Sequence, residues 1–343
     1  QDLLRADVPL FPPDVNHSQA VFAVEGNGIR YALAAIKNVG LQAMESLVAE
    51  RTTNGPFKNL ADFAARLDGK TVNKRQLENL IAAGALDSLL VSENINRRQV
   101  FEAVDFLLSQ NHLKRQEKAN KQTLLFGESP QNQAPLTVPT VKPWGLLESL
   151  QKEFDALGFY QSAHPLDIYK DSLETLQLTA SQDLAAKASE SLTAVNVAGI
   201  VLFKQERTSK NGQKFAFVGL SDNTGAYEIA LFSEIYQQTR DFLNPGVAVY
   251  VAAGLRAEGE SYRLTAQSLE LLDHKTQSQS VVLKVNQNFD VQAFKAFLQT
   301  CSTGKTKIKL ELSLPDLPLA QVTLPGGYSL SADQRSQLFS FLN

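Results

Sequence analysis

The residues that most often carry out catalysis are few and scattered in this chain. His17, His112, His164 and His274 lie far apart, and Cys301, the one cysteine, has no histidine at the spacing of a metal site. The sequence also has no Asp-x-Asp pair for magnesium, no G-x-x-x-x-G-K-S/T phosphate loop and no G-x-S-x-G nucleophile turn. We therefore predict no catalytic residue and no metal ligand here, and a structural role for His164 and Cys301.

Residue types that hold phosphate occur in the first third of the chain. In "IRYALAAIKNVGLQAMESLV" a helix is expected to end at Ile36–Gly40 and a second helix to begin at once. Such a hairpin exposes backbone N–H groups that, with the helix dipole and a lysine, hold a phosphate without reading bases. "NLIAAGALDSLL" looks like a second, degenerate hairpin, although both segments could equally be ordinary helical turns. The candidate DNA contacts are Lys37, Asn38, Val39, Gly40, Lys74, Arg75 and Gly84.

A basic loop occurs later, in "KQERTSKNGQKF". Its four cations are opposed by one acid, Glu206, so the loop carries about +3, and Phe215 and Phe217 follow at strand spacing. A basic loop next to aromatic strand residues suits single-strand binding by charge attraction and base stacking. We expect the two phenylalanines to be core residues and leave open whether the loop is merely solvated. The cations are Lys204, Arg207, Lys210 and Lys214.

A short peptide with large apolar residues, "KQTLLFGESPQN", precedes a proline-studded tract. A free peptide of this kind can insert its Leu–Phe pair into a partner's pocket while the Gln amide sets the register. The alternative is a helix C-terminus that folds back on its own bundle and is closed by Gly127. The peptide residues are Gln122, Thr123, Leu124, Leu125 and Phe126.

Composition sets broad limits on the protein class. A chain of 343 residues is long enough for two to four domains, and 43% hydrophobic with 20% charged residues is ordinary for a folded protein. The net charge of −3 means that any nucleic-acid contact must come from local patches. With no signal peptide and no long apolar run, we expect a cytoplasmic location and no membrane contact. The chain begins at Gln1 and its one methionine, Met44, is internal, so we expect a piece of a longer protein.

The elements that would position these residues predict a multi-domain α+β protein. Residues 1–127 are mainly helical, with apolar residues such as Leu77, Leu80, Ile81 and Leu86 at helical spacing. Residues 128–143 resemble a flexible linker, and 144–193 a helical connector. Residues 194–273 contain five strand-like runs with a helix, 233–243, between the third and fourth, which is the order of an OB-fold barrel. Another five-stranded barrel used for protein contacts is the alternative. Residues 280–343 predict a small α/β domain.

These pieces, in this order, resemble the C-terminal region of the alpha subunit of DNA polymerase III, the C-family of bacterial replicative polymerases. The segments that carry the resemblance are "PPDVNHS", "IRYALAAIKNVG", "ERTTNGPFKNLADFAAR", "NKRQLENLIAAGALDSL", "QTLLFGE" and "EFDALGFYQSAHPLDIY". The resemblance implies a tandem helix-hairpin-helix element that grips duplex DNA, with Asn38 where the family usually has glycine. It further implies that Gln122–Phe126 bind the beta sliding clamp, that the OB domain meets the single-stranded template, and that the last domain contacts the tau subunit of the clamp loader.

The resemblance also implies what this chain lacks. The family's histidinol-phosphatase-like domain and its palm, whose aspartates bind magnesium, lie upstream and match nothing here. We therefore predict a non-catalytic part of a polymerase with no cofactor of its own, whose role is to make replication processive. Two other hypotheses remain: an OB-fold scaffold for protein interactions, and an RNA-binding subunit such as that of a tRNA-charging enzyme.

Overall fold

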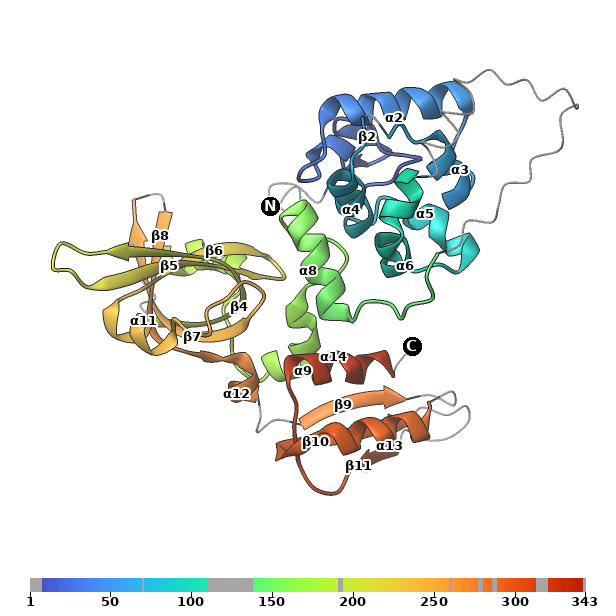
Figure 1. The fold of residues 1–343 in the computed structure, drawn as a ribbon. Helices are drawn as coiled ribbons and strands as arrows, with labels where there is room; N and C mark the ends of the chain where they lie inside the picture. The colour runs from blue at the N-terminus through green and yellow to red at the C-terminus, as the bar shows by residue number, and fades with distance from the viewer. Residues whose placement is uncertain are drawn as a thin grey trace, which may run out of the picture. The chain divides into compact units, whose positions relative to one another are not determined.

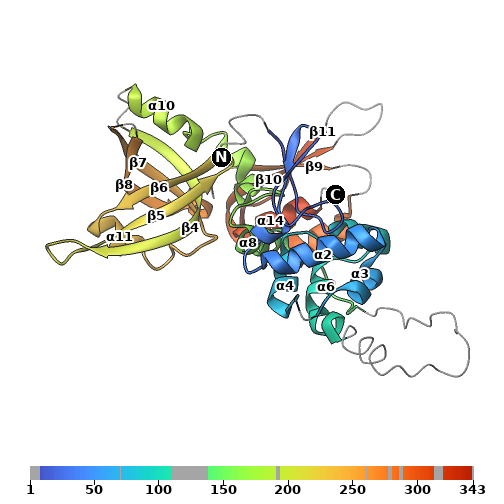
Figure 2. The same cartoon turned by 90° about the horizontal axis from the view of Figure 1, so that it is seen from above.

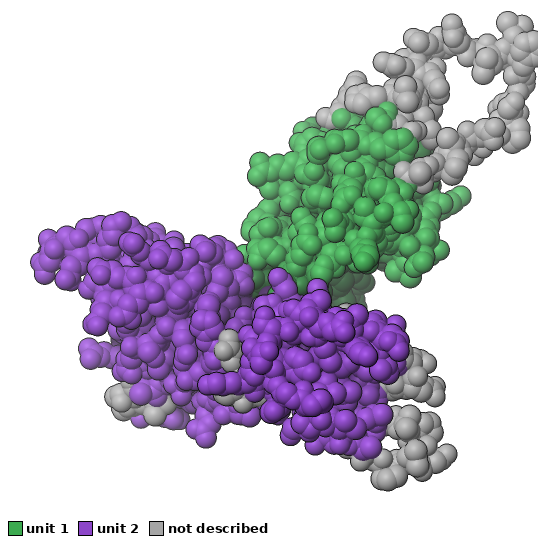
Figure 3. Space-filling view, turned by 60° about the horizontal axis from the view of Figure 1, so that its bottom comes forward, with its two compact units in different colours: residues 1–162 green, residues 163–343 purple. Residues whose placement is uncertain are grey.

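The computed structural model divides into two compact units, residues 1–162 and 163–343 (Figures 1 and 3). It describes residues 8–69, 71–109, 138–190, 194–259, 261–276, 280–285, 289–312 and 320–341. The peptide Gln122–Phe126 and most of the expected linker 128–143 lie outside these ranges. No helix within them has the length and apolar character needed to cross a bilayer. The boundary between the units falls inside the segment 144–193 that the sequence groups as one connector.

Unit 1 is a helical domain with a small sheet at its start. The sheet has the order β1-β3-β2, with β1 and β3 parallel. The structured segments are β1 (Leu10–Phe11), β2 (Ala23–Glu25), β3 (Gly28–Arg30), η1 (Leu33–Ala35), α2 (Leu41–Asn54), α3 (Leu60–Arg66), α4 (Lys74–Ala82), α5 (Asp87–Leu90), η2 (Val91–Glu93), α6 (Arg97–Glu102) and α8 (Leu146–Leu157). The helix expected before the first hairpin is only the 3-10 turn η1.

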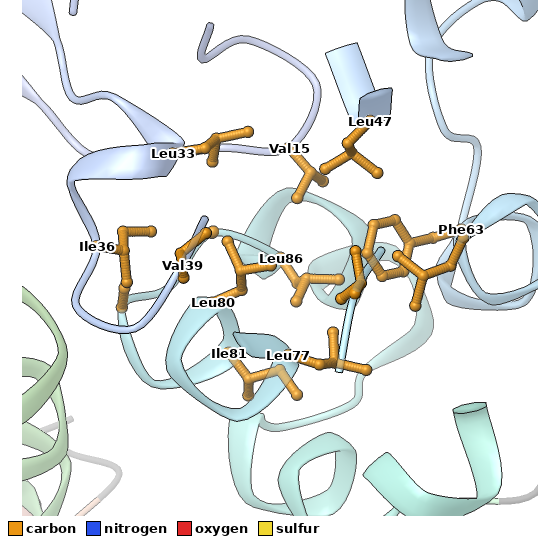
Figure 4. Close-up of a cluster of buried hydrophobic side chains, with 14 of the residues drawn as sticks. Val15, Leu33, Ile36, Val39, Leu47, Phe63, Leu77, Leu80, Ile81 and Leu86 are labelled. Carbon is orange, nitrogen blue, oxygen red and sulfur yellow. The ribbon is translucent and has the colours of Figure 1, made fainter. Parts of the chain in front are cut away.

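The core of unit 1 follows the helical spacing of its apolar residues. Leu77, Leu80 and Ile81 share one face of α4 and are fully buried, as is Leu86 just after it. They meet Ile36 and Val39 of the first hairpin (Figure 4). Truncating one such leucine to alanine typically costs about 2–5 kcal/mol, because lost burial and a residual cavity add. The hairpin is therefore held rigidly against α4.

Asparagine side chains start three of these helices. Asn59 accepts a hydrogen bond from the Asp62 N–H at the start of α3, and Asn73 and Asn96 form reciprocal capping boxes at α4 and α6. Asn96 also donates to the carbonyl of Val141 at 3.1 Å. The described end of the expected linker is therefore bound to α6 by side-chain hydrogen bonds.

Unit 2 begins with short helices and continues into a barrel, which Figure 1 views roughly end-on and Figure 2 from a direction 90° away. The barrel is closed in the order β4-β5-β6-β8-β7, with β6 and β8 parallel, which confirms the OB-fold. The helices before it are η3 (Pro165–Tyr169), α9 (Lys170–Leu173), η4 (Ser181–Asp183) and α10 (Leu184–Ser189). The barrel elements are β4 (Ala194–Thr208), β5 (Lys214–Asp222), β6 (Gly225–Leu231), α11 (Ser233–Thr239), β7 (Ala248–Glu258), β8 (Ser261–Leu271) and α12 (Leu272–Thr276).

The C-terminal part of unit 2 is the expected small α/β domain. Its central strand β10 pairs in parallel with β9 and antiparallel with β11 and β12. Helix α13 connects β9 to β10, so the three form a β-α-β unit. The elements are β9 (Ser280–Val285), α13 (Val291–Thr300), β10 (Ser302–Leu312), β11 (Ala320–Thr323), β12 (Tyr328–Ser329) and α14 (Ala332–Ser340).

Candidate nucleic-acid interface

The first hairpin forms in spite of the asparagine at its tip. Asn38 has φ 63°, a left-handed conformation that asparagine tolerates better than other residues with a Cβ atom. Ile36 and Val39 on either side of the Lys37–Asn38 pair are buried in the core, while Lys37 and Asn38 are exposed. The turn is therefore anchored by its apolar residues and presents its polar ones to solvent.

The N-terminus of α2 is open to an anion. Gly40 is the residue that precedes α2, no side chain caps the helix there, and its first turn contains no acid. The N–H groups of the first turn have no partner within the helix, and the dipole of this 14-residue helix adds partial positive charge. Backbone N–H groups and dipole together suit a phosphate oxygen.

Lys37, three residues before Gly40 in the sequence, is held by α8. Its backbone N–H donates to the carbonyl of Ala156 at 2.8 Å, and its ammonium lies 5.5 Å from the ring centre of Phe154. Both contacts orient the lysine without neutralising it, because neither partner carries a charge. Lys37 is therefore exposed, and within the described residues no acidic side chain forms an ion pair with it.

The start of α4 lies next to the start of α2. A Cβ atom added at Gly40 would lie 3.3 Å from Nε2 of Gln76, whose other amide atom accepts the Asn73 N–H in the capping box. Lys74 is paired with Asp105 at 2.6 Å, which raises the pKa of the lysine mainly through their hydrogen bond. Arg75 is exposed and has no ion-pair partner within the described ranges. Lys74 thus has an acidic partner that would compete with a phosphate, and Arg75 has none among the described residues.

The second hairpin is closed instead of exposed. Gly84 is buried with φ +80°, and the N–H of Ala85 donates to the carbonyl of Leu80, so α4 ends in a Schellman turn. The space beside its Cα is filled by the guanidinium of Arg97, which donates from Nε to Asp87 at 2.8 Å. Gly84 ends a helix and presents no backbone to a phosphate, so the expected DNA contact there does not fit the structure.

In the barrel, strand alternation separates the four predicted cations. Lys204 donates to the carbonyl of Arg240 at 2.8 Å. Lys214 pairs with Glu206 at 2.7 Å, and this hydrogen bond is the main reason why the pKa of the carboxyl is lowered. Arg207 lies on the other face of the hairpin, and Lys210 is exposed in the turn between β4 and β5. The loop therefore does not present its four cations as one basic patch, because Arg207 lies on the other face of the hairpin from Lys204 and Lys214.

The face that carries Arg207 is aromatic. Phe215 and Phe217 are half-buried on this face, whereas Ala216 and Val218 between and after them point into the core. The expectation that the two phenylalanines are core residues is therefore wrong, because the strand alternates and its other side faces the barrel interior. The Arg207 guanidinium lies 5.6 Å from the ring centre of Phe217.

Two further phenylalanines extend this face, and neither was predicted from the sequence to be functional. Phe203 is 48% exposed and covers Gly219, where a Cβ atom would collide with its ring. Phe232 is 51% exposed and stacks on Phe215 with ring centres 6.1 Å apart and planes 26° apart. The pairing of β4 with β5 places Phe203 opposite Gly219 and Arg207 opposite Phe215. The aromatic face is hereafter Phe203, Arg207, Phe215, Phe217 and Phe232.

The histidine and the cysteine that were considered as reactive groups, His164 and Cys301, lie where they contribute to the packing of the fold. His164 accepts the Leu166 N–H at Nδ1 and lies 3.0 Å from Ser221 through Nε2, and burial lowers its pKa to about 4. Cys301 is half-buried, which raises the pKa of its thiol. Within the described residues, no three His, Cys, Asp or Glu side chains gather in a way that could hold a metal ion.

Comparison with known proteins finds matches to two parts of the chain and to relatives along nearly its whole length. Residues 7–100 match the helix-hairpin-helix motif, and residues 195–272 match the OB-fold nucleic acid binding domain. DNA polymerase III subunit alpha of Caulobacter vibrioides is 34% identical over 98% of this chain, that of Borreliella burgdorferi is 31% identical over 86%, and that of Chlamydia trachomatis is 28% identical over 99%. The chain spans 30%, 26% and 27% of the length of these relatives.

Proposed function

Because this chain is homologous over nearly its whole length to part of the DNA polymerase III alpha subunit, we propose that it holds the polymerase on its DNA without performing the chemistry. It contains a helix-hairpin-helix DNA-binding region and an OB-fold nucleic-acid-binding domain. In this proposal nucleotide transfer, and the magnesium it needs, belong to the part of the subunit that this chain does not span, and the protein works in the bacterial cytoplasm.

The aromatic face of the barrel is the observation that carries the single-strand part of the proposal. Its two most exposed rings, Phe203 and Phe232, offer surfaces on which bases can stack, and Arg207 supplies a cation beside them. Stacking tolerates any base, since every base has a π-face, and each stacked base contributes about 1–3 kcal/mol. Such a face holds a template strand without reading its sequence, as a replicative polymerase requires.

Duplex DNA is proposed to bind at the first hairpin. A phosphate oxygen at the start of α2 would accept hydrogen bonds from the backbone N–H groups around Gly40. Lys37 in the preceding turn and Arg75 at the start of α4 would supply positive charge. These contacts touch only the backbone of DNA, so they fix position without sequence preference. Lys74 is already paired with Asp105, and its contribution requires that this exposed pair open.

Two protein contacts complete the proposal. Gln122–Phe126 would bind the beta sliding clamp as a Gln-x-x-Leu-Phe peptide, and residues 280–343 the tau subunit of the clamp loader. A micromolar peptide contact corresponds to about 8 kcal/mol. Tethering this peptide to a DNA-bound domain raises its effective concentration, so avidity increases without new contacts. The homology supports both contacts, and the Gln-x-x-Leu-Phe motif supports the contact with the clamp. The peptide itself lies outside the described residues.

The single-strand proposal is tested by fluorescence anisotropy with a labelled dT oligonucleotide. The double variant Phe203→Ala, Phe232→Ala should lose at least about 2 kcal/mol, or about 30-fold in affinity, because two stacking surfaces are removed. Phe106→Ala, which removes a ring 40% exposed in unit 1, is the matched control and should bind like the parent. Equal binding by all three proteins would contradict the proposal. Weak binding that ignores salt would favour a protein-interaction scaffold.

The clamp proposal is tested by calorimetry with the cognate sliding clamp. The double variant Gln122→Ala, Phe126→Ala should lose the interaction, while Gln133→Ala, a change in the same tract outside the motif, should keep it. Retained binding by the double variant would place the clamp contact elsewhere. Because the DNA and clamp measurements use different variants, one part of the proposal can fail while the other stands.

A further inference from the structure

The sheet of the C-terminal domain has two unlike faces. One face is apolar and carries Val281, Leu283 and Val285 of β9 beside Ile308 of β10, all buried. Helices α13 and α14 cover it, and Phe341 packs against Phe294 and Phe297 on that side. The opposite face therefore has no part in the core of this domain.

Lysines occupy that opposite face. Lys305, Lys307 and Lys309 alternate along β10 with the buried residues, and Lys284 of β9 lies opposite Glu311 in the strand pairing. Glu311 is the one acid at these positions, so four positive charges against one leave about +3 on a chain whose net charge is −3. The lysine face is hereafter Lys284, Lys305, Lys307 and Lys309.

Most of these lysines form no ion pair with any residue that the structure describes. Lys307 donates to the carbonyl of Gly326 at 2.6 Å, which ties the strand to the turn before β12. Lys284, Lys305 and Lys309 have no ion-pair partner in the part of the chain that the structure describes, and Lys284 and Lys305 are exposed. Like charges on neighbouring strand positions repel each other, so the row is unfavourable for the isolated domain. An anionic partner would remove that repulsion.

We propose that the lysine face binds the phosphate backbone of a single-stranded nucleic acid. Alternate residues of a strand are about 6.6–6.8 Å apart, which is close to the distance between successive phosphates of an extended strand. The other positions on this face are Ser280, Val282, Gln321 and Thr323, so it offers hydroxyl donors but no ring for base stacking. The face thus differs from the aromatic face of the barrel: it holds a backbone by charge and leaves the bases free.

The test uses the full chain and a labelled dT40 oligonucleotide, with anisotropy titrations between about 50 and 200 mM salt. The face variant is Lys305→Gln, Lys309→Gln, which keeps Lys307 and its bond to Gly326. The charge-matched control is Lys170→Gln, Lys295→Gln, two exposed lysines outside β9 and β10. Each lost phosphate contact lowers the slope of log affinity against log salt by about 0.7, so the face variant should lose about 1.4 and the control nothing.

Two additional measurements make the result decisive. The variant Lys305→Arg, Lys309→Arg keeps the charges and should retain the parent slope, and an unchanged circular dichroism spectrum of the glutamine variant would exclude a folding defect. The variant Phe203→Ala, Phe232→Ala should bind the oligonucleotide more weakly without a change in the slope of log affinity against log salt. A failure of the barrel proposal can therefore be distinguished from a failure of the lysine-face proposal. A parent-like slope in the glutamine variant would overturn the inference. If that variant lost only the binding of poly-glutamate, the lysine face would be a site for an acidic protein.

Discussion

Replacing Gly84 by alanine distinguishes between two roles of this residue, the termination of a helix and contact with a phosphate. The residue has φ +80°, where a Cβ atom costs about 1–2 kcal/mol. The added methyl group would also overlap the guanidinium of Arg97, whose shift would weaken a partly exposed ion pair with Asp87 worth about 0.2–1 kcal/mol. We therefore expect Gly84→Ala to destabilise unit 1 by about 1–3 kcal/mol.

The assay for this variant is urea unfolding followed by tryptophan fluorescence. Trp144 is the one tryptophan of the chain, and it packs against Phe101 with ring centres 5.3 Å apart, so its emission reports on unit 1. In an Arg97→Ala background the added methyl group no longer overlaps a guanidinium. Gly84→Ala should then lower the free energy of unfolding only by the cost of the positive φ, and a double-mutant cycle measures the difference.

Binding of duplex DNA by the folded variant decides between the two roles. A glycine that only ends a helix leaves the affinity of Gly84→Ala within about twofold of the parent, because nothing exposed has changed. A tenfold loss of duplex affinity with unchanged stability would refute this reasoning, since Gly84 would then contact the phosphate backbone.

Three other predictions concern charge. Lys37→Gln should lower the salt slope of duplex binding by about 0.9, in anisotropy titrations with Asn38→Gly as the control that keeps the turn and the charge; an unchanged slope would remove Lys37 from the interface. Glu206→Gln should free Lys214 and raise affinity for single-stranded DNA about two- to fivefold at low salt, and a loss of affinity would instead show that the ion pair orders the hairpin. The pKa of His164 is depressed from 6.5 to about 4, so its stabilising effect is complete above pH 6.5 and is lost as the pH falls toward 4. Thermal unfolding should therefore show unit 2 losing up to about 3 kcal/mol over that range, and His164→Gln should lose correspondingly less.

Local sequence was sufficient to predict the buried face of α4 and the order of elements in the barrel. The spacing of Leu77, Leu80 and Ile81 predicted a buried helix face, and five strand-like runs with a helix before the fourth predicted the barrel. These features are set by residues within a few positions of each other, where periodicity and turn chemistry act directly. The turn Lys37–Gly40 just before the start of α2 was predictable in the same way, because turns and helix starts depend on neighbouring residues.

Only the tertiary structure decided which side chains face solvent and which charges are free. A bulge between Val201 and Phe203 turns the first into the barrel core and the second onto the aromatic face, although simple alternation would put both on one side. Likewise, Arg97 covers Gly84 from 13 positions away in a separate helix, and the pairing of β4 with β5 neutralises Lys214 with Glu206. These outcomes depend on register and packing between distant segments, which no local pattern encodes.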